Sequence, residues 1–251
     1  MTFEPCKRKN LALARSAFLA LTRSPSVWAL LAGACGLSLL LVLLPLPMVD
    51  PAASAVDGCA SIAFLLTLLV CTAALRVNPA SDWGLYPTAA GTNICVTWLG
   101  GWVAISALLG ALCVTQLITT TIFVSQRVDL LTEETVASAA DFGSVYTNCL
   151  LLALVLHAWG TGLSLWLGPL LSTVGLLLVA TSASLVPTYA AQFPPLLLLP
   201  DLGALSPVGN ALRGFPSPAL AAYAVAHAVV PLALAATLQH IGAARGWRAR
   251  A

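Results

Sequence analysis

Long apolar stretches alternate with short polar ones along the chain, and their spacing predicts membrane-spanning helices. Residues 27–44 and 58–75 are two charge-free runs of 18 residues each, close to the roughly 20 residues that a helix needs to cross a bilayer. A third apolar run covers 94–124, which is longer than one span requires. Gly100-Gly101 is a candidate weak point in it. We therefore expect the third helix to be tilted, broken or frayed at its outer end.

The second half of the chain is apolar for longer than one helix can explain. Residues 142–200 contain no Asp, Glu, Lys or Arg. Gly168-Pro169 divides this stretch, because Pro cannot continue a helix and Gly favours a helix end. The division predicts a fourth span at 146–167 and a fifth at 170–190.

A proline-rich apolar segment precedes the last predicted span, which covers 219–238. Residues 192–218 contain six of the sixteen prolines of the chain. So many prolines exclude a continuous helix, yet the segment is too apolar for a free loop. We expect a re-entrant or surface-lying segment that is shielded by protein, because irregular backbone at membrane depth needs such cover.

Residues 7–24 predict an amphipathic helix ahead of the first span. At 100° per residue, basic and apolar side chains gather on different arcs of this helix. Such a helix is suited to lie in the cytoplasmic headgroup layer, although an ordinary basic flank that fixes topology is the alternative. The residues of interest are Arg8, Lys9, Arg15 and Arg23 on the polar arc, and Leu11, Ala14, Phe18 and Leu21 on the apolar arc.

Composition and charge support this interpretation. The chain is 59% apolar and only 8% charged, whereas soluble domains carry about 25% charged residues. In the six-span arrangement nine of the eleven basic residues fall on one side, and only Arg127 and Arg213 fall on the other. The positive-inside rule then places both termini in the cytoplasm. We predict an all-α, multi-pass protein of the inner or plasma membrane, with residues 1–251 forming a single transmembrane domain and no basic patch for nucleic acid.

The sequence contains no motif for catalysis or metal binding. It lacks the GxxxxGK[ST] sequence of a P-loop, so any ATP that drives the protein must bind to another polypeptide. The seven cysteines include no CxxC pair. Cys59 and Cys149 fall near one membrane face and are candidates for a disulfide, but buried free thiols are the commoner state. We expect no metal and no cofactor in this chain.

Several polar side chains fall inside the predicted spans. His157 and His227 lie in the fourth and sixth spans, where an ionisable group suggests function. Paired ligation of a haem is one hypothesis, and a neutral histidine bonded to a neighbouring helix is the favoured one. In the third span we expect polar side chains to face the protein interior, as helix contacts or as a pathway lining; these are Thr115, Gln116, Thr119, Thr120 and Thr121.

The polar stretch between the second and third spans has a recognisable order of features. Arg76 ends the second span, an acid-x-Gly-Leu sequence and a proline follow, and a new apolar helix starts at Ile94. This order resembles that of ABC-2-type permeases, the transmembrane subunits of ATP-binding-cassette transporters. The resemblance implies that the stretch forms a coupling helix that docks into the ATPase subunit. The implied residues are Arg76, Asp82, Trp83, Gly84, Leu85 and Pro87.

The resemblance extends to the whole layout: the amphipathic helix, six spans and a proline-broken segment before the last span. Asp82-Trp83-Gly84-Leu85 departs from the Glu-rich basic stretch and Gly-Thr pair that the family often has. Cytochrome c maturation permeases share the layout and are a sub-family option. The resemblance implies a non-enzymatic exporter subunit, homodimeric or heterodimeric, for a hydrophobic or amphipathic cargo, with ATP and Mg²⁺ bound by a separate ATPase chain. The alternatives are a haem- or quinone-associated membrane anchor and a non-transporting assembly subunit.

Overall fold

Helices account for every regular element that the structure describes, and no strand occurs among the described residues. This confirms the predicted all-α class. The computed structural model describes residues 4–43, 51–77, 94–126, 138–164, 167, 169–183, 186–189, 191–194, 198–208, 210 and 214–244. The helices are α1 (Glu4–Thr22), α2 (Pro25–Leu43), α3 (Pro51–Val77), α5 (Ile94–Gln126), α6 (Ala139–Ser164), α7 (Pro169–Ala183), α8 (Val186–Tyr189), α9 (Leu202–Leu205) and α10 (Pro218–Ala244).

Four helices in the described part of the chain are long and apolar enough to cross a membrane, namely parts of α3, α5, α6 and α10. A fifth crossing results if α1 and α2, which meet at a bend of 57°, together count as one broken span. The apolar part of α7, Leu170–Thr181, is shorter than a span. The helices are therefore consistent with a multi-pass membrane protein, and the sixth span remains a prediction.

Several predicted boundaries differ from the structure. α3 begins at Pro51 rather than near 58, and α10 ends at Ala244 rather than near 238. α6 begins at Ala139 rather than near 146, because Ser138 and Asp141 form a capping box. The backbone N–H and hydroxyl of Ser138 donate to Asp141 Oδ2 at 2.7 and 2.8 Å, and Asp141 N–H donates back to Ser138 Oγ at 3.3 Å. α7 ends at Ala183 rather than near 190, and a separate short helix, α8, follows at Val186–Tyr189.

The long third helix is continuous. α5 runs for 33 residues from Ile94 to Gln126 without interruption at Gly100-Gly101, so the predicted weak point is not a break. At 1.5 Å per residue, α5 is about 50 Å long, which exceeds the roughly 30 Å hydrocarbon thickness of a bilayer. A helix of this length must tilt or extend beyond the hydrocarbon layer.

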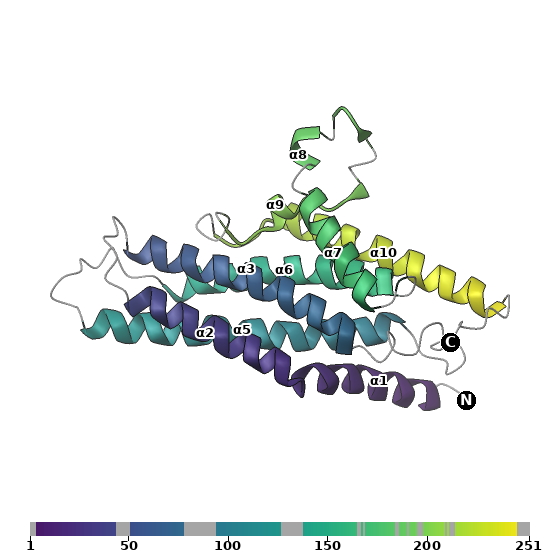
Figure 1. Ribbon diagram of the computed structural model, residues 1–251, viewed down its shortest axis with the longest axis horizontal. Helices are drawn as coiled ribbons and strands as arrows, with labels where there is room; N and C mark the ends of the chain where they lie inside the picture. Colours follow the sequence, from purple (N-terminus) through teal and green to yellow (C-terminus); the bar gives the residue numbers. More distant parts are fainter. Residues whose placement is uncertain are drawn as a thin grey trace.

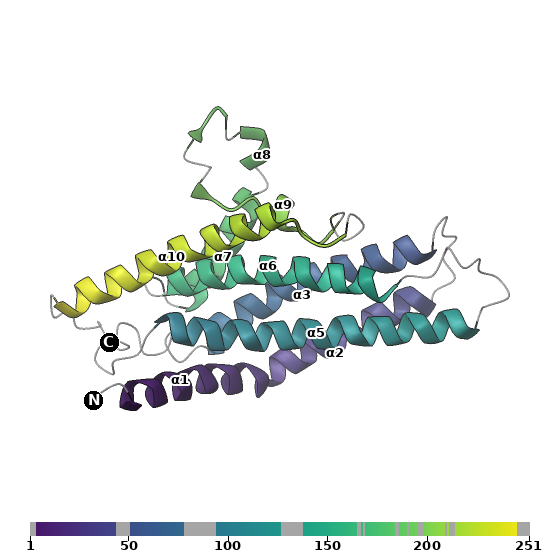
Figure 2. The same cartoon turned by 180° about the vertical axis from the view of Figure 1, so that it is seen from behind.

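The long helices lie side by side along the longest axis of the molecule (Figures 1 and 2). α6 is the central helix, because it packs against α3, α5, α7 and α10. The start of α1, the end of α3, the start of α5 and the end of α10 lie at the same end of the bundle (Figure 1). This is the arrangement that the charge pattern predicts, although the membrane face on which this end lies stays a prediction.

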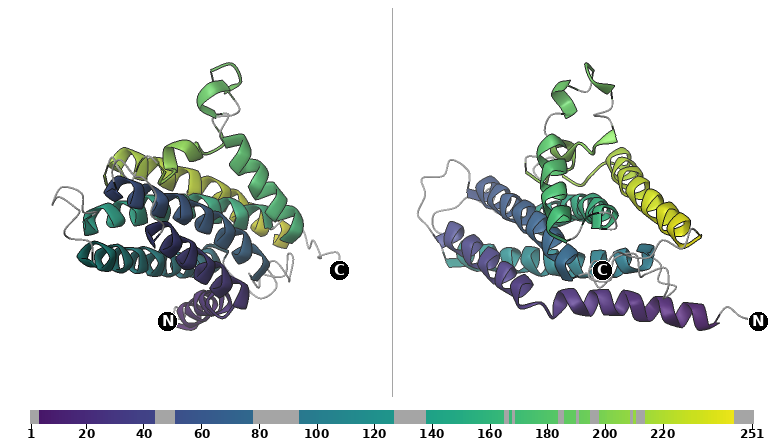
Figure 3. Two further views of the ribbon diagram at one scale, coloured as in Figure 1. Left: turned by 60° about the vertical axis from the view of Figure 1, so that its left-hand side comes forward. Right: turned by 45° about the vertical axis from the view of Figure 1, so that its right-hand side comes forward.

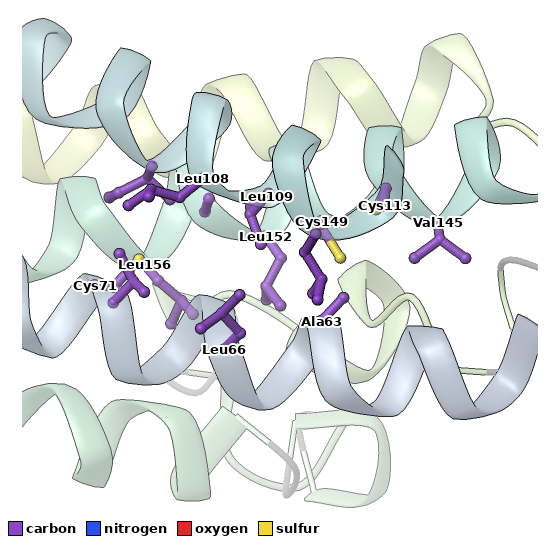
Figure 4. Close-up of a cluster of buried hydrophobic side chains, with 14 of the residues drawn as sticks. Ala63, Leu66, Cys71, Leu108, Leu109, Cys113, Val145, Cys149, Leu152 and Leu156 are labelled. Atoms are coloured by element: carbon purple, nitrogen blue, oxygen red, sulfur yellow. The ribbon is translucent and has the colours of Figure 1, made fainter. Parts of the chain in front are cut away.

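A dry core fills the space between α3, α5 and α6 (Figure 4). Leu66 of α3, Leu109 of α5 and Leu152 of α6 are each at most 2% exposed. Cys113 and Cys149 belong to the same cluster, where a thiol packs as a small apolar group. Such interdigitated packing holds helices together in a membrane, where the surrounding lipid is as apolar as leucine.

The proline-rich segment before α10 is irregular, as predicted, and one short helix attaches it to the bundle. Leu202 and Leu205 of α9 are buried, and α9 contacts α6, α7 and α10. Asp201 N–H donates to the Tyr223 hydroxyl on α10 at 2.7 Å. α8 instead projects away from the side of the bundle (Figures 1 and 3). Whether this segment re-enters the membrane stays a prediction.

The capping box at the start of α6 leads to a first prediction. Replacing Asp141 with Ala removes the acceptor for two Ser138 donors, and we expect a loss of about 1 kcal/mol in the free energy of unfolding. Unfolding of the purified protein by SDS in mixed micelles measures it. Asp141→Glu is the control, because Glu at this position preserves the capping box. Equal stability of the Asp141→Ala variant and the native protein would contradict the assignment.

Candidate functional site

The first two turns of α5 contain two adjacent glycines, and each accommodates a different neighbour. A Cβ on Gly100 would collide with the backbone of Ala14 in α1. A Cβ on Gly101 would lie 2.5 Å from Nε2 of His157 in α6. Only glycine permits both close approaches, because any larger residue places a carbon where the neighbour already lies. We call Gly100, Gly101, Ala14, His157 and Trp98 the α5 junction.

α1 packs against the bundle with one apolar side. Ala17 and Leu21 are buried, and Ala14 and Phe18 are half-buried, at the i, i+3, i+4, i+7 spacing of one helix face. Leu11, which the sequence assigns to the same face, is 73% exposed. The packed side of α1 therefore begins at Ala14 among the described side chains.

The polar arc of α1 faces away from the bundle where it is described. Arg15 and Arg23 are exposed, as predicted, whereas the side chains of Arg8 and Lys9 lie outside the described residues. The interfacial position of α1 therefore stays a prediction. The distribution of its described side chains is that of an amphipathic helix.

A tight elbow joins α1 to α2. The Nε1–H of Trp28 donates to the Thr22 carbonyl at 2.5 Å, and the Thr22 hydroxyl donates to the Phe18 carbonyl at 2.9 Å. Val27 N–H donates to the Ser24 carbonyl at 3.1 Å, which starts α2. These bonds satisfy backbone groups that the break leaves without a helical partner, so the 57° bend is held on both sides.

His157 is packed against α5 rather than free. Its side chain is 2% exposed, and its ring stacks on Trp98 with centroids 6.5 Å apart and an angle of 18° between the planes. The ring faces the Trp98 backbone, but neither ring nitrogen makes a hydrogen bond of ordinary geometry. The histidine thus contacts a neighbouring helix, but the hydrogen bond to that helix that the sequence favours is not formed with ordinary geometry.

The second histidine lies at the same depth but has other contacts. Ala158 of α6 and Ala228 of α10 belong to one buried cluster, which places His157 and His227 at matching levels. The ring of His227 packs on Tyr223 with centroids 4.4 Å apart. The two imidazoles thus have separate aromatic partners. Within the described ranges, no three His, Cys, Asp or Glu side chains are arranged to hold a metal.

Cys59 and Cys149 are free thiols, both buried. The Cys59 thiol is in hydrogen-bonding contact with the thiol of Cys113 in α5, while the Cys149 thiol contacts the Thr67 side chain. The candidate disulfide between Cys59 and Cys149 is therefore not formed, and the thiols pack as apolar groups.

The polar residues of α5 divide into two sets. Gln116 and Thr120 are buried, as predicted. Thr121 is exposed, so the expectation that it faces the interior is wrong. Thr115 is also exposed, but its side chain is in hydrogen-bonding contact with the Cys35 thiol of α2. Each donates its hydroxyl to the carbonyl four residues earlier at 2.8 Å, and this bond to its own helix lets threonine face lipid at little cost.

The predicted coupling segment lies almost wholly outside the described residues. Arg76 belongs to α3, but its side chain is not described, and positions 82–87 fall within the gap between α3 and α5. The end of α3 and the start of α5, which flank the segment, lie at one end of the bundle (Figure 1). Gly100 follows Ile94 by six residues, which is less than two helical turns.

The sequence shows the glycine pair of the junction but not its role. Two adjacent glycines in an apolar run suggest a helix weakness, because glycine is unfavourable in a helix interior. A close contact with a neighbouring helix is the other use of glycine in membranes, and it applies here. The partner of each glycine follows only from the packing of α1 and α6.

Comparison with known proteins adds no relative. No family model matches the sequence, and no curated protein or solved structure is significantly similar to it. The functional argument therefore rests on the arrangement of helices and on the α5 junction.

The contact between Gly101 and His157 leads to a second prediction. Gly101→Ala should lower the free energy of unfolding by about 1–3 kcal/mol, because the new methyl group overlaps the imidazole. His157→Ala removes the obstacle, so the double variant should be more stable than the sum of the single effects predicts, by about 0.5–3 kcal/mol. SDS unfolding in mixed micelles provides the free energies of unfolding of the native protein, the two single variants and the double variant, which together form a double-mutant cycle.

Gly36→Ala is the matched control, because a Cβ on Gly36 meets nothing within 4 Å. Its effect should add to that of His157→Ala without coupling. Coupling of the same size in the control cycle, or none between Gly101 and His157, would show that the imidazole does not occupy the position described.

Proposed function

We propose that the chain is the transmembrane permease subunit of an ABC exporter that moves a hydrophobic or amphipathic cargo out of the cytoplasm. The observation that carries the proposal is the position of α5. It follows directly after the predicted coupling segment and, within two turns, contacts both α1 and α6. The order of features from Arg76 to Pro87 supports the same function, because it resembles that of ABC-2-type permeases.

The proposed mechanism is mechanical transmission. ATP and Mg²⁺ bind to a separate ATPase, whose closure displaces residues 78–93. α5 is a continuous helix, so it moves as a rod when its first turn is pushed. Backbone contact at Gly100 then moves α1, and the His157 contact at Gly101 moves α6. Displacement of these helices opens a path for the cargo in a dimer of permease subunits.

The nature of the proposed cargo rests on the outer segment between α7 and α10. Tyr189, Phe193 and Leu198 are each close to half exposed or more. Exposed apolar side chains of this kind suit contact with a lipid-like or amphipathic molecule better than contact with an ion. The chain itself contributes no catalytic residue to the proposed reaction cycle.

A substitution in the coupling segment tests the proposed function. Gly84→Arg places a bulky cation where the family docks into the ATPase, so it should raise the Kd for the ATPase chain at least tenfold, about 1.4 kcal/mol in binding free energy. Less ATPase should then co-purify, and ATP hydrolysis that depends on this chain should fall. Membrane insertion and the unfolding free energy should not change. Co-purification and ATPase assays in proteoliposomes measure both quantities.

Gly91→Arg is the matched control, because it adds the same charge to the same stretch outside the motif. It should leave ATPase binding intact. Unchanged ATPase binding and ATP hydrolysis in the Gly84→Arg variant would reject the segment as the ATPase contact. An equal loss of ATPase binding in both variants would reject it as well.

The proposal includes a second permease copy, and α2 offers a face for it. Gly33 and Gly36 are exposed on α2, and a Cβ on either meets nothing within 4 Å. Small residues at such spacing let membrane helices approach closely. We expect the double variant Gly33→Leu and Gly36→Leu to retain its fold and to lose most self-association, as measured by energy transfer between labelled copies in liposomes.

Small residues on α10 supply the control for self-association. Ala222 and Ala226 are exposed one turn apart on α10, so Ala222→Leu with Ala226→Leu adds the same bulk elsewhere. Energy transfer should be unaffected in this control. Unchanged transfer in the α2 variant would place any dimer contact on another face.

A further inference from the structure

The outward side of α1 combines exposed cations with exposed apolar side chains. Arg15 and Arg23 are exposed, and Leu11 is 73% exposed. Trp28, at the elbow with α2, is 53% exposed and fixed by its bond to the Thr22 carbonyl. This combination differs from a solvated basic surface, which has no reason to present a leucine and a tryptophan beside its arginines.

The two arginines lie on one side of the helix. They are eight residues apart, which corresponds to about 12 Å along the axis and a rotation of about 80°. No acidic residue occurs between Glu4 and Asp50, and α5, the main packing partner of α1, contains neither Asp nor Glu. The positive charge of Arg15 and Arg23 is therefore not balanced by a carboxylate in α2 or α5, and the one carboxylate of α1, Glu4, lies eleven residues before Arg15.

We propose that this side of α1 binds the headgroup of an anionic phospholipid. Guanidinium groups bind phosphate oxygens through paired hydrogen bonds, and anionic lipids attract basic helices that lie at the membrane surface. Leu11 and Trp28 occupy the boundary between headgroups and acyl chains, where leucine and tryptophan are favourable. A free phosphate ion would use the arginines but would leave these apolar side chains in water.

The lipid has a structural consequence for the junction. α1 contacts α5 through the backbone at Gly100, and the elbow fixes its direction relative to α2. A headgroup bound across Arg15 and Arg23 holds α1 in the orientation that makes this contact. Anionic lipid therefore stabilises the folded protein. This inference rests on the membrane location of the helices and not on the proposed transport function, so either can fail without the other.

Thermal stability of the full chain in mild detergent tests the inference. Phosphatidylglycerol should raise Tm more than phosphatidylcholine of the same chain length does, because a ligand that binds only the folded state stabilises it. The double variant Arg15→Gln and Arg23→Gln should lose most of this difference, and the single variants should each lose part of it. Lysine at both positions should retain part of it, and added salt should reduce it.

The control variant, Arg127→Gln with Arg213→Gln, replaces two arginines predicted to lie on the other membrane face. It should keep the full difference in Tm between phosphatidylglycerol and phosphatidylcholine. Three results would overturn the inference: no preference for phosphatidylglycerol, an unchanged preference in the Arg15 and Arg23 variants, or equal loss in the control. Equal stabilisation by inorganic phosphate would also reject a lipid ligand. If the double variant does not fold in phosphatidylcholine, the single variants and the lysine variant decide.

Discussion

The structure depends on one constraint: backbone N–H and C=O groups within a membrane must form their hydrogen bonds with the protein, because no water is present there. A polar group that faces hydrocarbon has no solvent partner, so the chain must satisfy its backbone internally. Helices do this over most of the described chain, and each interruption has its own solution. The Trp28 indole satisfies the Thr22 carbonyl at the elbow, and Asn210 donates to the carbonyls of Ala204 and Ser206 after α9. Ser144 on α6 donates to the Gly214 carbonyl at the end of the irregular segment.

The same constraint explains how the helices approach one another. Lipid provides no hydrophobic driving force between helices, so close packing must supply the attraction. Gly100 and Gly101 allow contacts that a side chain would prevent. Gly162 of α6 lies against Pro231 of α10, but an added Cβ there would stand 3.4 Å from the Pro231 backbone, which is an ordinary contact distance. The proline within α10 therefore packs against a glycine of α6 without the exclusion of a side chain that Gly100 and Gly101 show.

Sequence patterns predict helix identity well and helix contacts poorly. The apolar runs give the class and the approximate positions of α2, α3, α5 and α10, because hydropathy and length suffice for a helix in lipid. The early start of α6 was also accessible, since Ser138 and Asp141 have the spacing of a capping box. The partners of Gly101 and His157 were not, because they depend on how separate helices rotate and pack. Thr121 shows the reverse error: a polar side chain need not face protein when its own helix supplies the acceptor.

The position of α1 links these observations to the proposed function. α1 is attached to α2 through the elbow and to α5 through Gly100, so it cannot move independently of either. A displacement that enters α5 from the preceding segment must therefore either carry α1 along or break the contact at Gly100. A headgroup bound to Arg15 and Arg23 resists movement of α1 away from the membrane surface. In the proposed mechanism, α1 moves with α5 along the membrane surface, and the elbow passes this movement to α2. In this arrangement, the proposed lipid keeps α1 at the membrane surface while the movement of α5 acts on α2.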